Sequence, residues 1–328
     1  MPPGEFELIE RYFRQPAEAL RIRRGDVPLG IGDDGALLRP PPGRELVAVL
    51  DTLVAGRHFP AGSPPRSIGH RALAVNLSDL AAMGAQPAWF LLALTLPAAE
   101  EAFLDAFAQG LFELAQQHGM ALVGGDTTAG PLAVSVQALG FVDAGTALRR
   151  GGAMPGDLLY VSGAPGEAAA GLQLALGEPA AALRDEQRQW LFERFHFPAP
   201  RIALGQALRG IASACIDVSD GLAADAGKLA AASGCAVTIE VERLPLSAAL
   251  HAQAGTQAAQ LALAGGDDYE LCFTVPPDRI AGLDGRLAGA GCAVTRIGHL
   301  EVGSGVMFSG KGIPPFGVLA GYEHFRAR

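Results

Sequence analysis

Residues 30–38 read "GIGDDGALL", where two adjacent aspartates stand between glycines within an apolar stretch. Five further stretches repeat this arrangement of aspartate at the edge of an apolar segment, usually beside glycine. They are "LDT" at 50–52, "NLSDLAAMGA" at 76–85, "VGGDTT" at 123–128, "IDVSDGL" at 216–222 and "GGDDYEL" at 265–271. One such carboxylate is explained as a turn residue or a helix cap, but six such clusters need a common explanation.

The composition indicates a folded protein with two domains. The chain has 328 residues, of which 49% are hydrophobic and 18% charged, which is enough for a sizeable core. Its net charge of -9 argues against sequence-independent nucleic-acid binding, which needs clustered surface cations. The acidic stretch "MPPGEFELIERYF" at 1–13 lacks the apolar core of a signal peptide, and no run of about 18 apolar residues predicts a membrane span. We therefore expect a cytoplasmic protein.

Alternating helical and strand patterns predict an α/β or α+β fold. Strands are expected at 46–50, 90–96, 120–124, 132–142, 158–162, 236–241 and 271–275. Helices are expected at 4–12, 67–83, 99–118, 166–177, 187–195, 200–210, 221–233 and 246–253. Hairpin-like pairs also occur, which favours mixed sheets flanked by helices. The Gly/Pro-rich stretch "RRGGAMPGD" at 149–157 predicts a boundary between domains at 1–148 and 149–328.

Two glycine-rich stretches are candidates for phosphate binding. "GVMFSGKG" at 305–312 ends in glycine where a P-loop needs Ser or Thr, and Pro314 and Pro315 follow, so we do not expect a nucleotide site there. "VSGAPGEAAAGLQLAL" at 161–176 combines a strand, a glycine loop and a helix. Its amides could receive an anion, although a plain strand-to-helix turn is the preferred interpretation.

Common catalytic and metal motifs are missing from the sequence. The cysteines at 215, 235, 272 and 292 are widely spaced without a C-x-x-C pair, so buried reduced thiols are expected. The histidines show no H-E-x-x-H spacing, and no G-x-S-x-G elbow occurs. His58, in "AGRHF", adjoins a candidate acidic segment, but a core or surface role is the default for it from spacing alone.

The aspartates are best explained together as magnesium ligands. Magnesium takes oxygen ligands, often one or two carboxylates with substrate phosphates, and bringing two anionic substrates together needs several such ions. Taken one at a time, the aspartates also fit local structural roles: Asp126 with Thr127 fits an Asx-turn, and Ser219 or Asp220 fits a helix cap. Neighbouring glycines allow close approach of backbone to ligand and favour the metal hypothesis. The candidate ligands are Asp33, Asp34, Asp51, Asp79, Asp126, Asp217, Asp220, Asp267 and Asp268.

These motifs resemble the thiamine-monophosphate kinase family. The resemblance rests, in family order, on "GEFELIERYF", "GIGDDGALL", "DTLVAGRHF", "ALAVNLSDLAAMGA", "GGDTTAGP", "IDVSDGL" and "GGDDYELCFT", with "GYEHF" near the end. It implies the two-domain fold of aminoimidazole ribonucleotide synthetase. The N-terminal α/β domain is then expected to bind metal and ATP and to form a homodimer, and the C-terminal α+β domain to complete the active site.

The resemblance further implies phosphorylation of thiamine monophosphate to thiamine diphosphate by ATP with several Mg²⁺ ions. No general base is expected, because the attacking phosphate oxygen is already ionised at neutral pH. The implied magnesium ligands are Asp34, Asp51, Asp79, Asp126, Asp217 and Asp220. The implied ATP contacts are Gly125, Asp126, Arg150 and Ser219. The implied thiamine phosphate contacts are His58, Asp268 and Tyr322, with Asp267 not separable from Asp268.

The sequence departs from the family before Asp51, where Val49 and Leu50 replace hydroxyl residues that are frequent there. Only backbone carbonyls could serve as ligands at these positions. Two alternatives stay open. One is another ATP-dependent enzyme of the same superfamily that activates an amidine or a selenide. The other is a non-catalytic protein that binds magnesium-nucleotide or thiamine phosphates.

Overall fold

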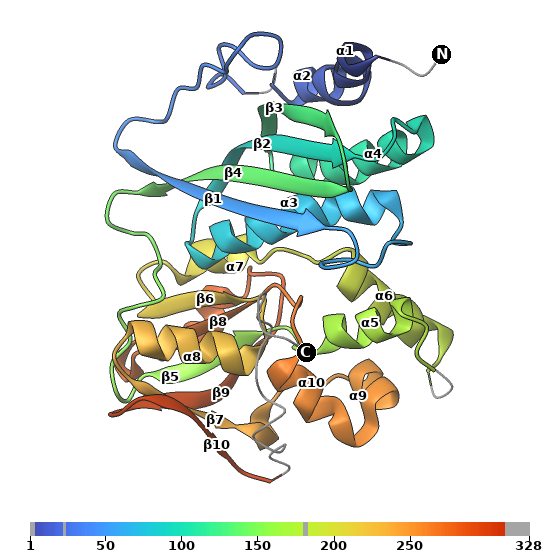
Figure 1. Cartoon of the computed structure of the whole chain (residues 1–328). Coiled ribbons are helices and arrows are strands. Elements are labelled where there is room, and N and C mark those ends of the chain that lie inside the picture. The colour runs from blue at the N-terminus through green and yellow to red at the C-terminus, as the bar shows by residue number, and fades with distance from the viewer. Residues whose placement is uncertain (1–3, 22–23, 180–182, 312–328) are drawn as a thin grey trace. The chain divides into compact units, whose positions relative to one another are not determined.

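A computed structural model describes residues 4–21, 24–179 and 183–311, and the chain divides into two compact units. The N-terminal unit comprises Met1–Leu80 with Ala85–Gly145, and the C-terminal unit comprises Ala81–Gly84 with Thr146–Arg328. Each unit contains its own mixed sheet with helices packed on it (Figure 1). The predicted fold class of mixed sheets flanked by helices is confirmed.

The N-terminal unit has a four-stranded sheet in the order β1-β4-β2-β3. The strands are β1 (Arg44–Val54), β2 (Gln86–Leu96), β3 (Ala121–Ala129) and β4 (Ala133–Asp143). β4 pairs antiparallel with β1 and β2, whereas β2 and β3 are parallel. Before β1 along the chain, the structure has α1 (Glu5–Leu8), the π-helix η1 (Ile9–Arg14) and α2 (Gln15–Arg21).

Helices α3 (Pro65–Ala82) and α4 (Glu101–Gln117) pack on one face of this sheet (Figure 1). They approach each other closely through two glycines. A Cβ on Gly69 would lie 2.0 Å from the Phe107 carbonyl oxygen, and one on Gly110 would lie 1.9 Å from that of Arg66. Leu104 and Leu111 of α4 are fully buried in the resulting core.

The other face of the sheet is only partly covered. Val27 packs there against Trp89, Leu139 and Phe141 in a small second core. Along β1, however, three large apolar side chains at even-numbered positions remain outside this core. They are Leu46, Leu50 and Val54, which are 49%, 64% and 36% exposed. β1 is also an edge strand, so apolar surface and unpaired backbone groups occur together in this region.

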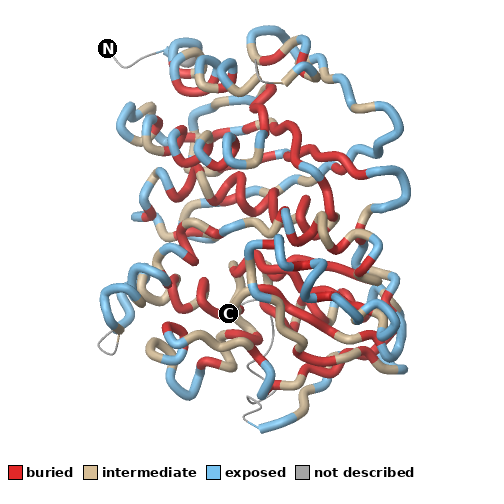
Figure 2. The backbone as a smooth tube through the Cα atoms, turned by 180° about the vertical axis from the view of Figure 1, so that it is seen from behind, coloured by how far each residue is buried: buried red, intermediate tan, exposed pale blue. Residues whose placement is uncertain are grey.

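The C-terminal unit has a six-stranded sheet in the order β10-β7-β9-β5-β8-β6. The strands are β5 (Leu158–Ser162), β6 (Ala214–Val218), β7 (Ala236–Glu240), β8 (Glu270–Val275), β9 (Val294–Glu301) and β10 (Gly305–Ser309). β10 and β7 are parallel, and the other pairs are antiparallel. Buried residues of the sheet and of its helices form one hydrophobic core, and Figure 2 marks the buried segments in red.

The helices of this unit lie between the strands along the chain. The α-helices are α5 (Glu167–Ala175), α6 (Asp185–His196), α7 (Ile202–Leu208), α8 (Leu222–Ala232), α9 (Ala248–Ala254), α10 (Ala258–Ala264) and α11 (Leu283–Leu287). Three short 3₁₀ turns are η2 (Val241–Arg243), η3 (Gly255–Gln257) and η4 (Pro277–Arg279).

The predicted strands and helices are all present, with shifted ends, but several elements were missed. β6, β9, β10, α10 and α11 had not been predicted. β10 occupies the start of "GVMFSGKG", so its first five residues form a strand where a P-loop would have a phosphate-binding turn. The first helical segment continues to Arg21 rather than ending near residue 12.

Candidate active site

Three loops of the C-terminal unit meet at one end of strands β5, β6 and β8. The "GGDDYE" segment is hydrogen-bonded along the end of β6: the amide of Asp267 donates to the Ser219 carbonyl at 2.9 Å, and that of Tyr269 donates to the Val218 carbonyl at 2.9 Å. Gly266 is needed for this approach, because a Cβ there would lie 2.5 Å from the Ser219 carbonyl oxygen. Two of the acidic stretches are therefore adjacent in space.

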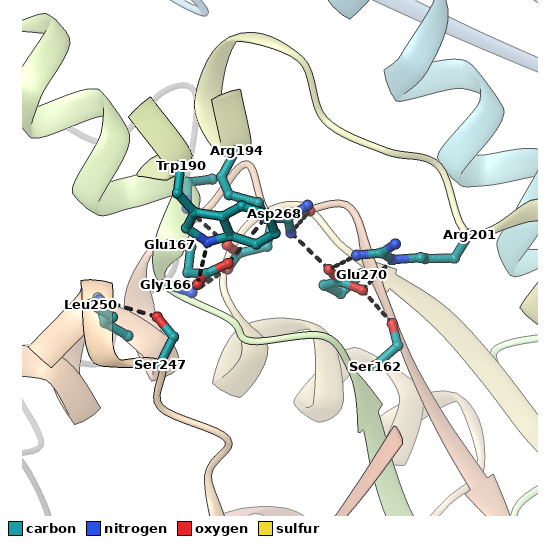
Figure 3. A network of polar contacts seen from close by, with 11 residues as sticks. Ser162, Gly166, Glu167, Trp190, Arg194, Arg201, Ser247, Leu250, Asp268 and Glu270 are labelled. Atoms are coloured by element: carbon teal, nitrogen blue, oxygen red, sulfur yellow. Dashed lines mark hydrogen bonds and ion pairs between the residues drawn. The ribbon is translucent and has the colours of Figure 1, made fainter. Parts of the chain in front are cut away.

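Asp268 fills the anion position that the sequence suggested for the glycine loop at 161–176. Its carboxyl group is fully buried and accepts hydrogen bonds from the amides of Gly166 at 2.7 Å and Ala168 at 3.2 Å, at the start of α5 (Figure 3). Burial raises the pKa of Asp268 to about 8, while these amides and Arg194 act in the opposite direction. The loop thus binds a carboxyl group of its own chain.

Asp267 lies in a different environment from Asp268, so the structure distinguishes the two residues that the sequence could not. Asp267 is partly exposed, and its Oδ1 accepts a hydrogen bond from the Tyr269 hydroxyl at 3.1 Å. Both Asp267 and Tyr269 have positive φ, at 71° and 50°. Such backbone conformations cost roughly 1–3 kcal/mol each in non-glycine residues and cluster at functional sites.

A buried ionic network, which sequence reasoning missed, supports this segment (Figure 3). Glu270 is fully buried and receives hydrogen bonds from Arg194 at 2.7 Å, Arg201 at 2.6 Å and the Ser162 hydroxyl at 2.5 Å. Arg194 also pairs with buried Glu167 at 3.2 Å. Arginines in α6 and just before α7 carried no recognisable local signal, because their partners are distant in sequence.

The loop after β6 carries the other acidic side chains of this unit. Asp217, on β6 opposite Leu271 of β8, is only 5% exposed. Asp220 is half-buried and forms an ion pair with Lys228 of α8. Burial would lower the pKa of Lys228, but Asp220 and Asp225 outweigh it and raise that pKa above its usual value.

The N-terminal unit holds the remaining predicted ligands. Asp51 lies on β1, and its amide donates to Asn76 Oδ1 of α3 at 3.1 Å. Asp79 is three residues further on the same helix face, so it lies one turn from this contact. Asp33 and Asp34 are exposed in the loop before β1, where the Asp34 amide donates to Asp33 Oδ1 at 2.9 Å.

Asp126 is exposed on β3, at the opposite edge of the sheet from Asp51. In the sheet, Asp126 pairs with Ala93 of β2, and Ala93 pairs on its other side with Ser135 of β4. Ser135 in turn pairs with Thr52 of β1. Three strand spacings separate β3 from β1, or about 14 Å. The sheet of one chain therefore does not bring Asp51 and Asp126 to a single point.

Of the other predicted positions, Gly125 has a clear structural requirement. A Cβ there would lie 1.9 Å from the Leu92 carbonyl oxygen, and its φ is 156°. His58 is half-buried in the turn after β1, and its Nδ1 accepts from the Val54 amide at 3.0 Å. Arg150 is exposed just inside the C-terminal unit. Tyr322 lies outside the described residues.

The predicted metal ligands are divided between the two units, so each unit holds only some of them. Within residues 4–21, 24–179 and 183–311, no group of three or more His, Cys, Asp or Glu side chains could hold a metal ion. The donor chemistry nevertheless fits magnesium, since every predicted ligand is a carboxylate. The ion pair at Asp220 also shows that this carboxylate already attracts a cation.

Comparison with known proteins places the chain. Family models for AIR synthase related proteins match it, the N-terminal domain over residues 32–142 and the C-terminal domain over 154–309. The thiamine-monophosphate kinase of Salmonella typhimurium is 48% identical over 328 residues, and that of Escherichia coli K12 is 47% identical over 327 residues, each covering 99% of both chains. The chain belongs to the thiamine-monophosphate kinase family. The predicted family and the predicted kinase class are confirmed.

Solved structures agree with this family assignment. The thiamine-monophosphate kinase of Stenotrophomonas maltophilia matches with a TM-score of 0.87 at 46% identity, covering 93% of this chain and 98% of that one. "AaThiL complexed with AMPPCP and TMP" matches with a TM-score of 0.77 at 32% identity, covering 98% and 97%. Hydrogenase maturation protein HypE of E. coli, at 22% identity and a TM-score of 0.71 over 93% and 99%, shares the fold. None of the described helices combines the length and apolar character needed to cross a membrane.

Proposed function

We propose that this family member transfers the γ-phosphoryl group of ATP to thiamine monophosphate, giving thiamine diphosphate and ADP. The observation that carries the proposal is the match over 98% of this chain to a relative described as bound to AMPPCP and TMP. AMPPCP is an ATP analogue, so its presence beside TMP in that relative supports ATP as donor and thiamine monophosphate as acceptor.

The acceptor phosphate is ionised at neutral pH, so the protein needs no general base and acts by positioning and charge neutralisation. Magnesium ions, when bound, neutralise the phosphates and support in-line displacement. The residues proposed to hold them are Asp34, Asp51, Asp79, Asp126, Asp217 and Asp220. Because Asp51 and Asp126 lie at opposite edges of the sheet, more than one ion is needed to engage both.

Gly125, Asp126, Arg150 and Ser219 are proposed to contact ATP. Arg150 is exposed, and its guanidinium can bind phosphate through two parallel hydrogen bonds. His58, Asp267, Asp268 and Tyr322 remain the proposed contacts of thiamine phosphate. The partial exposure of Asp267 favours it as the residue that touches substrate. The buried carboxyl group of Asp268, which accepts a hydrogen bond from the Gly166 amide, favours a supporting role for this residue.

The test is an assay for ADP release with magnesium-ATP, run with and without thiamine monophosphate, with chromatographic detection of thiamine diphosphate. We expect ADP and thiamine diphosphate in equal amounts, and no turnover after chelation of magnesium. ADP formed only with a different acceptor, such as an amidine or a selenide, would keep the superfamily chemistry and overturn the substrate. Binding of nucleotide without ADP release would overturn the catalytic proposal.

We also propose that the chain forms a homodimer through β1. Leu46, Leu50 and Val54 present apolar surface on an edge strand, and such edges are normally paired or protected. All four cysteines are free, as expected in a reducing compartment, which supports the proposed cytoplasmic location.

Sedimentation of a Leu50→Arg variant tests the dimer. A charge at the centre of an apolar interface loses its hydration without gaining a partner, so dimer affinity should fall at least about 100-fold. The control is Leu176→Arg, because Leu176 is equally exposed at 64% but lies at the end of α5. We expect dimers for the wild type and the control, and monomers for Leu50→Arg. A wild type that is monomeric at every concentration would contradict the proposal.

A further inference from the structure

A buried carboxylate on α8 fixes the loop that carries Ser219 and Asp220. Asp225 is 1% exposed, and its Oδ2 accepts hydrogen bonds from the amides of Ser219 at 3.0 Å and Asp220 at 2.9 Å. Its other oxygen, Oδ1, accepts from Lys228 Nζ at 2.8 Å. One carboxylate thus holds both the loop backbone and a lysine, so the loop and the ammonium group keep a fixed relation.

The same ammonium group reaches the side chain of Asp220. Lys228 Nζ donates to Asp220 Oδ2, and the two side chains are 43% and 33% exposed. Lys228 is one of only two lysines in a chain that otherwise uses arginine. A lysine ammonium is a flexible point charge, whereas an arginine fork holds a carboxylate bidentately. The pair with Asp220 is therefore suited to exchange.

We propose that the Lys228 ammonium is an intramolecular counter-ion for Asp220 that a divalent cation must displace, so that Lys228 sets the metal affinity of this carboxylate. The inference rests on the proposed role of Asp220 as a magnesium ligand. Displacement leaves no buried charge unpaired, because Asp225 keeps Lys228 when Asp220 turns to the metal. Lys228 is a positioning residue here, since it acts through Asp220 and not on the substrate.

The test measures Mn²⁺ binding to the full chain without nucleotide, by electron paramagnetic resonance of the free ion. Removing the competing charge in Lys228→Gln should lower the Kd for Mn²⁺ about threefold to tenfold. Lys228→Arg keeps the charge and should not tighten binding. The Mg²⁺ concentration for half-maximal turnover should fall in Lys228→Gln as well. The matched control removes the charge of Arg243, which pairs with Glu240 on the surface. It should change neither the Kd for Mn²⁺ nor the Mg²⁺ concentration for half-maximal turnover.

Asp220→Asn separates failure of this inference from failure of the metal assignment. We expect it to weaken Mn²⁺ binding and to remove the effect of Lys228→Gln in the double variant. Wild-type Mn²⁺ binding in Asp220→Asn would overturn the metal role of Asp220 itself. Weaker binding in Asp220→Asn without tighter binding in Lys228→Gln would overturn only the counter-ion role.

A second variant covers the case in which Lys228→Gln fails to fold because Asp225 loses its partner. The double change Asp225→Asn/Lys228→Gln replaces the ion pair by an amide pair of similar shape. It leaves Asp220 without the ammonium and should show the same tightening of Mn²⁺ binding. Unchanged affinity in this folded variant would overturn the inference.

Discussion

Asp126→Asn should lower kcat/KM for thiamine diphosphate formation by about a thousandfold or more, because it removes one negative charge from a site whose catalysis depends on cation placement. Asparagine has the same shape but is a far weaker magnesium ligand. The side chain is exposed on β3, and no hydrogen bond or ion pair joins its carboxylate to another described residue. The free energy of unfolding should therefore stay within about 0.5 kcal/mol of the wild type.

The matched control for Asp126→Asn is Asp105→Asn, which removes the same charge from an exposed position on α4 of the same unit. ADP release and thermal unfolding are measured for both variants. The control should keep wild-type turnover, which would show that the loss at Asp126 is local and not an effect of net charge. Undiminished turnover in Asp126→Asn would remove Asp126 from the proposed metal and ATP site. Asp217→Asn is a weaker test, because Asp217 is nearly buried and its replacement perturbs the sheet.

The sequence predicted elements whose signal is local. Apolar runs such as "FLLALTL" at 90–96 predicted buried strands, because period and residue type suffice for a strand between two layers. β6 was missed because its run is short and includes Asp217, and β9 because its polar side chains hide the pattern. In β9, Arg296 and His299 interrupt the apolar run around the buried Ile297 and Leu300.

Arrangement in space could not be predicted in the same way. No local pattern states that β1 and β3 form opposite edges of one sheet, so the separation of Asp51 from Asp126 was invisible in the sequence. Likewise, Arg194 and Glu270 meet although they are 76 positions apart along the chain. Motif resemblance supplied the proposed roles of these aspartates, but it said nothing about the side chains that support them. The supporting network follows only from the folded arrangement, in which α6 packs on α5 and α9 and its Arg194 reaches Glu167 and Glu270.

Glu270→Gln should destabilise the C-terminal unit by about 3–5 kcal/mol at neutral pH, because it leaves two largely buried arginines without their shared carboxylate. The side chains of Arg194 and Arg201 are only 8% and 16% exposed. Urea unfolding followed by circular dichroism measures the loss. The matched control is Glu113→Gln, which breaks an ion pair with Arg66 whose side chains are 47% and 48% exposed. That change should cost less than about 1 kcal/mol.

The pH dependence gives the Glu270 prediction a second readout. Burial alone would raise the pKa of Glu270, but the hydrogen bonds and charges of Arg201 and Arg194 outweigh it and hold the pKa below its ordinary value of 4.5. The unfolded state then binds more protons than the folded state as the pH falls. The stabilisation that ionised Glu270 contributes is thus fully present above the pKa that this group has in the unfolded state. It is lost as the pH falls through the pKa of the folded state. The difference in unfolding free energy between the wild type and Glu270→Gln should accordingly become smaller in acid. A difference that does not change with pH would contradict the ionic explanation.

Replacing Glu270 should also alter the proposed substrate site, because the backbone segment that carries Asp267 ends at Glu270. Asp267 and Tyr269 lie three residues and one residue before Glu270 and have positive φ. This strain of roughly 1–3 kcal/mol each persists only where the surroundings enforce it. The network at Glu270 is of comparable strength, so without it the segment is free to relax and Asp267 moves from its position beside Ser219. In the folded Glu270→Gln variant, KM for thiamine monophosphate should therefore rise more than KM for ATP. Equal changes in both constants would instead indicate a general loosening of the unit.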